Sequence, residues 1–167
     1  MPRLFALDQN FPEPLLNAAA PFLPEVELVP VRLIDQRLSD MDDWEILLSL
    51  HLHARPWDGL ITTDNSMLGQ PRELATLRQT NLRLVVARSG HDPIRATGLV
   101  LSHLDYICRE TTETRAQMWE LTARNGPATD PWKLIEKAAR HQHREADAVW
   151  QEVRLSAQEL QTNPLAG

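Results

Sequence analysis

Two aspartates follow short apolar stretches, and this common setting suggests a common role. Asp8 comes directly after residues 3–7, and Asp64 comes directly after residues 59–63. Short apolar runs bounded by turn residues are typical of buried strands. Ligands of open α/β sheets bind beyond the carboxyl ends of the strands. If the two strands are parallel neighbours, Asp8 and Asp64 converge at one edge of the sheet.

Asp43 is a third candidate, because it falls in the first turn of the helix expected before residues 59–63. Asp42 is placed to cap this helix and Glu45 to complete a capping box, which leaves Asp43 free. Three close carboxylates repel one another unless a cation neutralises them. Oxygen ligands favour hard ions such as Mg²⁺ or Mn²⁺. Such a site suits phosphodiester hydrolysis, because the ion acidifies water and stabilises charge on the attacked phosphate.

The hydrophobic pattern up to residue 108 predicts strands that alternate with helices. The expected strands are 3–7, 26–31, 59–63 and 82–87, and the expected helices are 10–20, 42–55, 71–81 and 92–108. Strands joined through helices pair in parallel with right-handed crossovers. The pattern therefore predicts an α/β sandwich around a mostly parallel four-stranded sheet. Residues 32–41 are expected to form a loop.

Beyond residue 109 we expect helices only. Residues 111–125 are predicted to form one helix ending at Asn125-Gly126, and a second helix begins at Asp130-Pro131 and extends to about residue 160. The second helix carries a narrow apolar seam, formed by Ile135, Ala139, Ala146, Val149, Val153, Ala157 and Leu160. Two interpretations remain equally open: docking on the sheet domain, or a surface for a partner or a second copy. The predicted division is an α/β domain of residues 1–109 and a helical extension of residues 110–167.

Composition narrows the classes of function. The net charge of −6 argues against a protein that binds nucleic acid through bulk positive charge, but a nuclease concentrates carboxylates at its metal site. With Cys108 as the single cysteine, no intrachain disulfide is possible. The N-terminus lacks the pattern of a signal peptide, and no stretch approaches the ~20 apolar residues that span a bilayer. A cytoplasmic protein with no membrane contact is therefore the expectation.

The order of these motifs resembles the PIN-domain nucleases. In that family an Asp follows the first strand, a later Asp opens a helix, and the next strand ends in Thr-x-Asp. Asp8, the helix start Asp43-Trp44-Glu45 and the strand end Thr62-Thr63-Asp64 fit this order. The start Asp8-Gln9-Asn10-Phe11-Pro12 is similar to the Asp-x-Asn-x-Pro of the PIN-like subgroup. The resemblance covers about residues 3–108.

This resemblance implies a PIN-like three-layer sandwich and a metal-dependent endoribonuclease, often the toxin of a toxin–antitoxin pair. Asp8, Asp43 and Asp64 match the family's metal carboxylates, so Mg²⁺ or Mn²⁺ is the implied cofactor and RNA the implied substrate. An antitoxin protein is an implied partner, and a homo-oligomer through the C-terminal helices is a further expectation. Asn10 and Asn65, next to the aspartates, are expected to orient water or ligand.

The chain departs from the family pattern in two ways. The family carries a further acidic residue on an intermediate helix, for which Asp35, Asp40 and Asp42 are candidates by position. Asn65 and Ser66 also replace the acidic or aromatic residues often seen after Thr-x-Asp. The alternative function is therefore a catalytically inactive PIN-like binding protein that acts through its C-terminal helices.

Basic residues refine these alternatives. Arg88 and Arg95 lie near the end of the fourth expected strand and the start of its helix, within reach of a substrate phosphate. An aspartyl-phosphate receiver also places Asp at strand ends, but it needs a Lys at the end of its last strand. The only lysines, Lys133 and Lys137, lie beyond the sheet region, which argues against a receiver.

Overall fold

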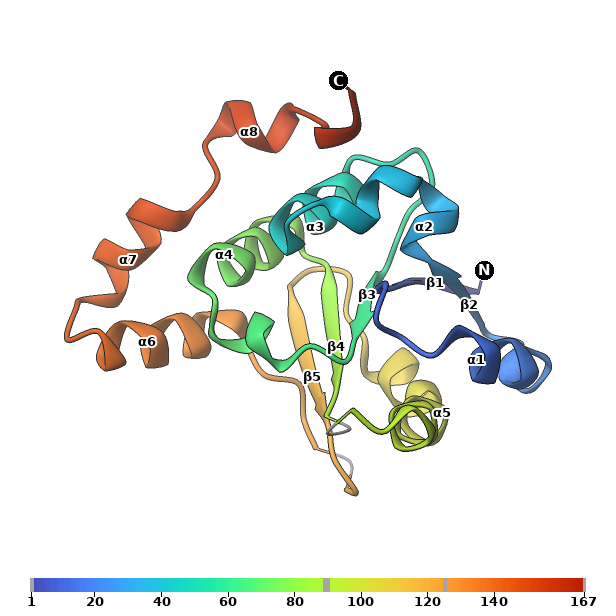
Figure 1. Cartoon of the computed structure of the whole chain (residues 1–167). Coiled ribbons are helices and arrows are strands. Elements are labelled where there is room, and N and C mark those ends of the chain that lie inside the picture. The colour runs from blue at the N-terminus through green and yellow to red at the C-terminus, as the bar shows by residue number, and fades with distance from the viewer. Residues whose placement is uncertain (1, 89–90, 125, 167) are drawn as a thin grey trace.

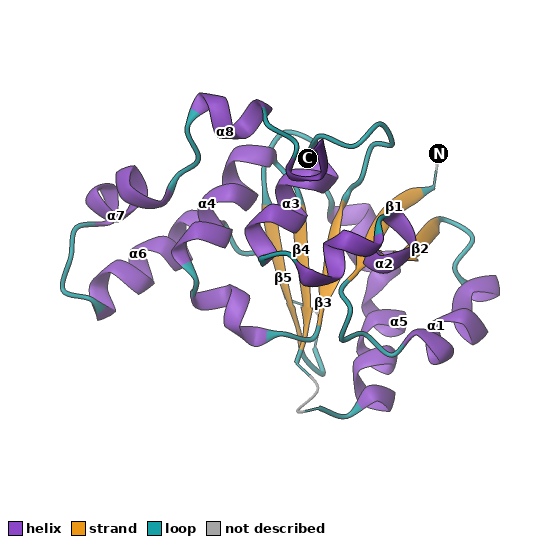
Figure 2. Ribbon diagram, turned by 45° about the horizontal axis from the view of Figure 1, so that its top comes forward, coloured by secondary structure: helices purple, strands orange, loops and turns teal. Residues whose placement is uncertain are grey.

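A parallel sheet lies between two layers of helices (Figures 1 and 2). The structure is a computed structural model that describes residues 2–88, 91–124 and 126–166. The strands are β1 (Arg3–Leu7), β2 (Val26–Pro30), β3 (Gly59–Thr62), β4 (Arg83–Ala87) and β5 (Gln117–Leu121). Their spatial order is β2-β1-β3-β4-β5, and every neighbouring pair is parallel.

Helices cover both faces of this sheet. The α-helices are α1 (Glu13–Ala19), α2 (Val31–Ile34), α3 (Asp43–His51), α4 (Pro71–Thr80), α5 (Pro93–Glu110), α6 (Pro131–His141), α7 (Ala146–Val153) and α8 (Ala157–Gln161). Short 3₁₀ segments are η1 (Ala20–Phe22), η2 (Gln36–Asp40), η3 (Asn65–Gly69) and η4 (Pro164–Ala166). Successive strand residues face opposite layers. Leu60 and Leu84 therefore pack with α3, α4 and α6, while Ile61 and Val85 pack with α5.

The predicted α/β class and parallel pairing are confirmed, but the predicted strand count of four is wrong. The chain expected as a helix over residues 111–125 contains β5, which pairs with β4 from Arg83 opposite Gln117 to Ala87 opposite Leu121. The sequence of β5, Gln-Met-Trp-Glu-Leu, shows neither a continuous apolar run nor a strict alternation, so no local strand signal marks it. Its pairing with β4 makes it a strand. The predicted helix end at Asn125 lies outside the described residues.

Two further predictions of local structure are wrong. Residues 32–41, expected as a loop, form most of α2 and all of η2. The single helix expected from residue 130 to 160 is divided into α6, α7 and α8. The first break includes His143, whose φ of 54° is the left-handed conformation that commonly ends helices.

The C-terminal helices dock on the sheet domain. The seam residues Ile135, Ala139 and Val149 are at most 1% exposed and join the core cluster that includes residues of α3 and α4. Farther along, the guanidinium of Arg72 on α4 donates to the carboxylate of Glu159 on α8 at 2.7 Å. The docking interpretation is therefore confirmed for these seam residues, and the chain end returns toward α3 (Figure 1).

In the described part of the chain, no helix combines the length and apolar character needed to cross a membrane. The predicted boundary at residue 109 precedes β5, so the segment after it contributes a strand to the sheet.

Candidate active site at the carboxyl edge of the sheet

The strand order creates a crevice between the ends of β1 and β3. From β1 the chain passes to β2 on one side, and it later crosses to β3 on the other. Such a switch point, at the carboxyl ends of the strands, is where open α/β sheets bind ligands. Asp8 and Asp64 follow these two strands, and the backbone N–H of Asp8 donates to the carbonyl of Ile61 at 2.9 Å.

Asp8 is 5% exposed, and hydrogen bonds hold its carboxylate in place. One oxygen accepts from the Thr62 hydroxyl at 2.8 Å, and the other accepts from the backbone N–H of Gln9 at 2.7 Å. The same Thr62 hydroxyl accepts from the backbone N–H of Asp64 at 3.0 Å, so one side chain joins both strand ends. Burial raises the pKa of Asp8 above its usual value, although these hydrogen bonds oppose the shift.

Asp64 is half-buried and caps η3. Its two carboxylate oxygens accept from the backbone N–H of Ser66 at 2.7 Å and from the Ser66 hydroxyl at 2.8 Å. Ser66, which departs from the family pattern, thus fixes the orientation of this carboxylate. A carboxylate has about four lone-pair sites, so both aspartates keep acceptor capacity for a further ligand.

Asp43 begins α3, and its carboxylate interacts electrostatically with those of Asp8 and Asp64. The helix start forms as expected, because Glu45 accepts from the backbone N–H of Asp42 at 3.0 Å. The pKa of Asp43 is raised to about 6, first by burial and then by the negative charges of Asp8, Asp64 and Asp42. Among the described residues, no positively charged group contributes to the pKa shift of Asp43. The three predicted carboxylates therefore lie close enough to repel one another.

Glu73 is a fourth acid beside this group, and sequence reasoning missed it. It lies in the first turn of α4 and is 7% exposed, and its pKa is raised by burial and by the charges of Asp43 and Asp42. An acid in a first helical turn usually complements the helix dipole, so its type and position carried no signal of a site. Of the earlier candidates, Asp35 caps η2 and Asp40 is exposed.

The donor atoms of this group are carboxylate oxygens, which hard divalent cations prefer as ligands. Among the described residues, no three or more His, Cys, Asp or Glu side chains are arranged to hold a metal ion. The group thus offers suitable ligands and charge without enclosing an ion.

Comparison with known proteins assigns no family. Searches against models of protein families, curated proteins and solved structures found no match. The PIN-like resemblance therefore stays a prediction from the residues, and so do the RNA substrate and the metal.

A pocket of about 640 Å³ opens beside Asp64. Asn10 and Asn65, the two asparagines expected to orient water or ligand, are exposed on its wall together with Asp64. His91 also lines it, and sequence reasoning did not select this isolated histidine. Its φ of 68° is unusual for a residue other than glycine, and such strain gathers at functional sites.

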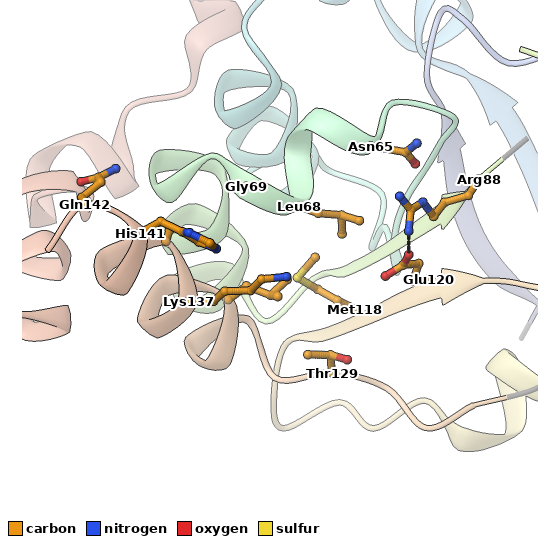
Figure 3. Close-up of a pocket in the computed structure, with 12 residues that line it drawn as sticks. Asn65, Leu68, Gly69, Arg88, Met118, Glu120, Thr129, Lys137, His141 and Gln142 are labelled. Atoms are coloured by element: carbon orange, nitrogen blue, oxygen red, sulfur yellow. Dashed lines mark hydrogen bonds and ion pairs between the residues drawn. The ribbon is translucent and has the colours of Figure 1, made fainter. Parts of the chain in front are cut away.

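The two arginines expected near a substrate phosphate differ in position. Arg88 is exposed and forms a 2.5 Å ion pair with Glu120, and both line a second pocket that adjoins Asn65 (Figure 3). Arg95 is exposed at the start of α5 and lines neither of these pockets.

Proposed function

We propose that this protein is a metal-dependent endoribonuclease in which Asp8, Asp43 and Asp64, the carboxylate site, hold Mg²⁺ or Mn²⁺. The observation that carries the proposal is the meeting of these acids at the switch point, where burial and then the negative charges of Asp8, Asp64 and Asp42 raise the pKa of Asp43 to about 6. Acids that repel one another destabilise a fold. The pKa values of Asp8 and Asp43 are both raised, and perturbed carboxylates in a crevice favour a functional role.

The surroundings of each acid suit this chemistry. A bound Mg²⁺ or Mn²⁺ supplies charge stabilisation at the attacked phosphate and lowers the pKa of water. Thr62 and Gln9 fix the carboxylate of Asp8, and Ser66 fixes that of Asp64, so both are oriented before substrate binds. The exposed amides of Asn10 and Asn65 would orient water or the RNA strand at the mouth of the pocket.

The alternative, an inactive binding protein that uses its C-terminal seam, has less support. Ile135, Ala139 and Val149 are buried within the chain, and a partner cannot reach them without unfolding this region. An antitoxin partner and a homo-oligomer through other surfaces stay predictions.

The decisive experiment incubates a mixed RNA pool with the purified wild-type protein in Mn²⁺ and in EDTA, and with the Asp8→Asn variant in Mn²⁺. We expect cleavage in Mn²⁺ and none in EDTA or with Asp8→Asn. The matched control is Asp105→Asn, which removes the charge of an exposed aspartate on α5 and should cleave like wild type. A parallel DNA pool tests whether the sugar matters.

Absence of cleavage by folded wild-type protein, together with absence of Mn²⁺ binding by calorimetry, would refute the nuclease function. Cleavage that persists in EDTA or in Asp8→Asn would show that the carboxylate site does not carry it.

A further inference from the structure

A second pocket, of about 430 Å³, opens between η3, β5 and α6 (Figure 3). Asn65 lines both this pocket and the one that contains Asp64, so the two adjoin. Small-molecule sites have volumes of ~300–1,000 Å³, which places this pocket in the usual range. We call it the Lys137 pocket, and its relevant residues are Asn65, Leu68, Met118, Leu134, Lys137 and His141.

One wall of the Lys137 pocket carries the ammonium group of Lys137, with the imidazole of His141 on the same helix. Lys137 and His141 lie four residues apart on α6, hence on one helix face, and both side chains extend from α6 toward the pocket in Figure 3. Arg88 is paired with Glu120, but Lys137 takes part in none of the ion pairs of the described residues. An ammonium group with no partner at a cavity wall is suited to bind phosphate. In a chain of net charge −6 this local positive charge favours an anionic ligand.

The rest of the lining is apolar with an amide at its edge. Leu68, Met118 and Leu134 come from η3, β5 and α6, and Met118 is 2% exposed. Leu68 and Leu134 are partly exposed, and their apolar surface suits a flat apolar group such as a nucleobase. The amide of Asn65, between the two pockets, can both donate and accept hydrogen bonds. A ligand that matches all three features has a flat base, a polar edge and an anionic group.

We propose that the Lys137 pocket binds one nucleotide of a single-stranded RNA next to the bond that the carboxylate site would cut, with Lys137 holding its phosphate. The placement of the nucleotide next to the cut bond rests on the proposed function. The binding of RNA in the pocket can be tested without cleavage. The shared chemistry is a nucleoside phosphate, which a free nucleotide also presents.

The chain offers a matched control on the same helix. Lys133, the other lysine, lies one turn before Lys137, is exposed, and lines a different pocket with Arg115 and Asp130. Lys137→Gln and Lys133→Gln remove the same charge from neighbouring turns of α6. Both side chains are exposed, so both variants should fold, and thermal unfolding checks this.

The experiment measures binding of a fluorescent single-stranded RNA by anisotropy, in EDTA and across a series of salt concentrations. Loss of a charge-assisted hydrogen bond in Lys137→Gln should weaken binding roughly tenfold. It should also reduce the salt slope of the binding constant by about 0.7, the value for one phosphate contact on a single strand. Lys133→Gln should weaken binding less than about twofold.

Competition with free adenosine monophosphate distinguishes the two sources of the ligand. Displacement of the RNA at millimolar nucleotide would show that the pocket also accepts free nucleotide. Retention of the RNA would show that the site requires a strand.

Equal weakening in both lysine variants, or absence of RNA binding by the wild type, would overturn the proposal. EDTA prevents metal-dependent cleavage, so this outcome is separate from the fate of the nuclease. Binding that depends on Lys137 without cleavage in Mn²⁺ would refute only the proposed function. If RNA is cleaved but its binding is unchanged in Lys137→Gln, only the proposed role of the Lys137 pocket would be refuted.

Discussion

The two ends of the sheet both carry aspartates in protected positions, but their surroundings are opposite. At the amino end, the carboxylate of Asp58 accepts from the Arg3 guanidinium and from the backbone N–H of Leu4, both at 2.8 Å, and the guanidinium of Arg83 lies 3.8 Å away. At the carboxyl end, the charge of Asp8 meets other carboxylates instead.

This difference separates Asp58, which stabilises the fold, from the acids of the carboxylate site, which favour a functional role. Asp58 lies between two guanidinium groups, so its charge is compensated where it sits. In the carboxylate site burial, and after it the charges of neighbouring carboxylates, raise the pKa of Asp43 to about 6, and a cation would offset that repulsion. The same residue type therefore predicts a structural role at one end of the sheet and a catalytic one at the other.

The largest expected effect is on catalysis. Asp8→Asn should lower the rate of Mn²⁺-dependent RNA cleavage by about a hundredfold or more, because changes around metal ligands already cost 10–100-fold. Asp58→Asn should keep the wild-type rate per folded molecule, because Asp58 lies at the other end of the sheet. The measurement is the initial cleavage rate at equal concentrations of folded protein. If folded Asp58→Asn were as inactive as Asp8→Asn, the two ends of the sheet would not differ in function.

Next in size is the stability of the amino end. Asp58→Ala leaves the side chain of Arg83, which is only 7% exposed, without its carboxylate. We expect a loss of about 3 kcal/mol in the free energy of unfolding and a melting temperature lower by roughly 9 °C. Asp105→Ala, at a side chain that is 75% exposed, should change stability by less than about 0.5 kcal/mol. A similar small change for Asp58→Ala would contradict the structural role.

The stability of the folded protein should depend on pH through Asp43, at the carboxyl end of the sheet. The folded pKa of Asp43 is about 6 and its usual value is 3.8, so between these pH values the folded state keeps a proton that the unfolded chain has released. The contribution of Asp43 to stability therefore falls as pH rises through this window and stays low above it. In EDTA near pH 8, Asp43→Asn should be more stable than wild type by about 1 kcal/mol.

Urea unfolding across this pH range measures the effect, and the difference between the two proteins should vanish below about pH 4. Lower stability of Asp43→Asn at alkaline pH would show that the charges of the carboxylate site are compensated after all.

The smallest effect is expected at Asn65, which is exposed and lies on both pockets. Asn65→Ala removes hydrogen bonds to substrate but no charge, so cleavage should slow by about threefold, mainly through a higher KM. Steady-state kinetics on a short RNA separates KM from kcat. A loss of cleavage rate as large as that of Asp8→Asn would show that Asn65 acts in the carboxylate site and does more than position the strand.

Sequence reasoning found Asp8, Asp43 and Asp64, and it missed Glu73. Asp8 and Asp64 were predictable, because alternating strands and helices place strand ends at one edge of a parallel sheet. Glu73 was not, because it comes from α4 and approaches Asp43 only when α3 and α4 pack together. His91 gave no signal either, since its position on the pocket depends on how the start of α5 faces β1 and β3.

The sequence by itself determined the local elements: the first four strands, the cap that opens α3, and the carboxylates placed just beyond β1 and β3. These depend on neighbours a few residues apart. Only the tertiary structure decided that Gln117–Leu121 is a strand, that the seam of α6 and α7 is core, and that Lys137 faces a pocket near Asn65. Strand pairing and burial are set by residues distant in the chain, so no local pattern contains them.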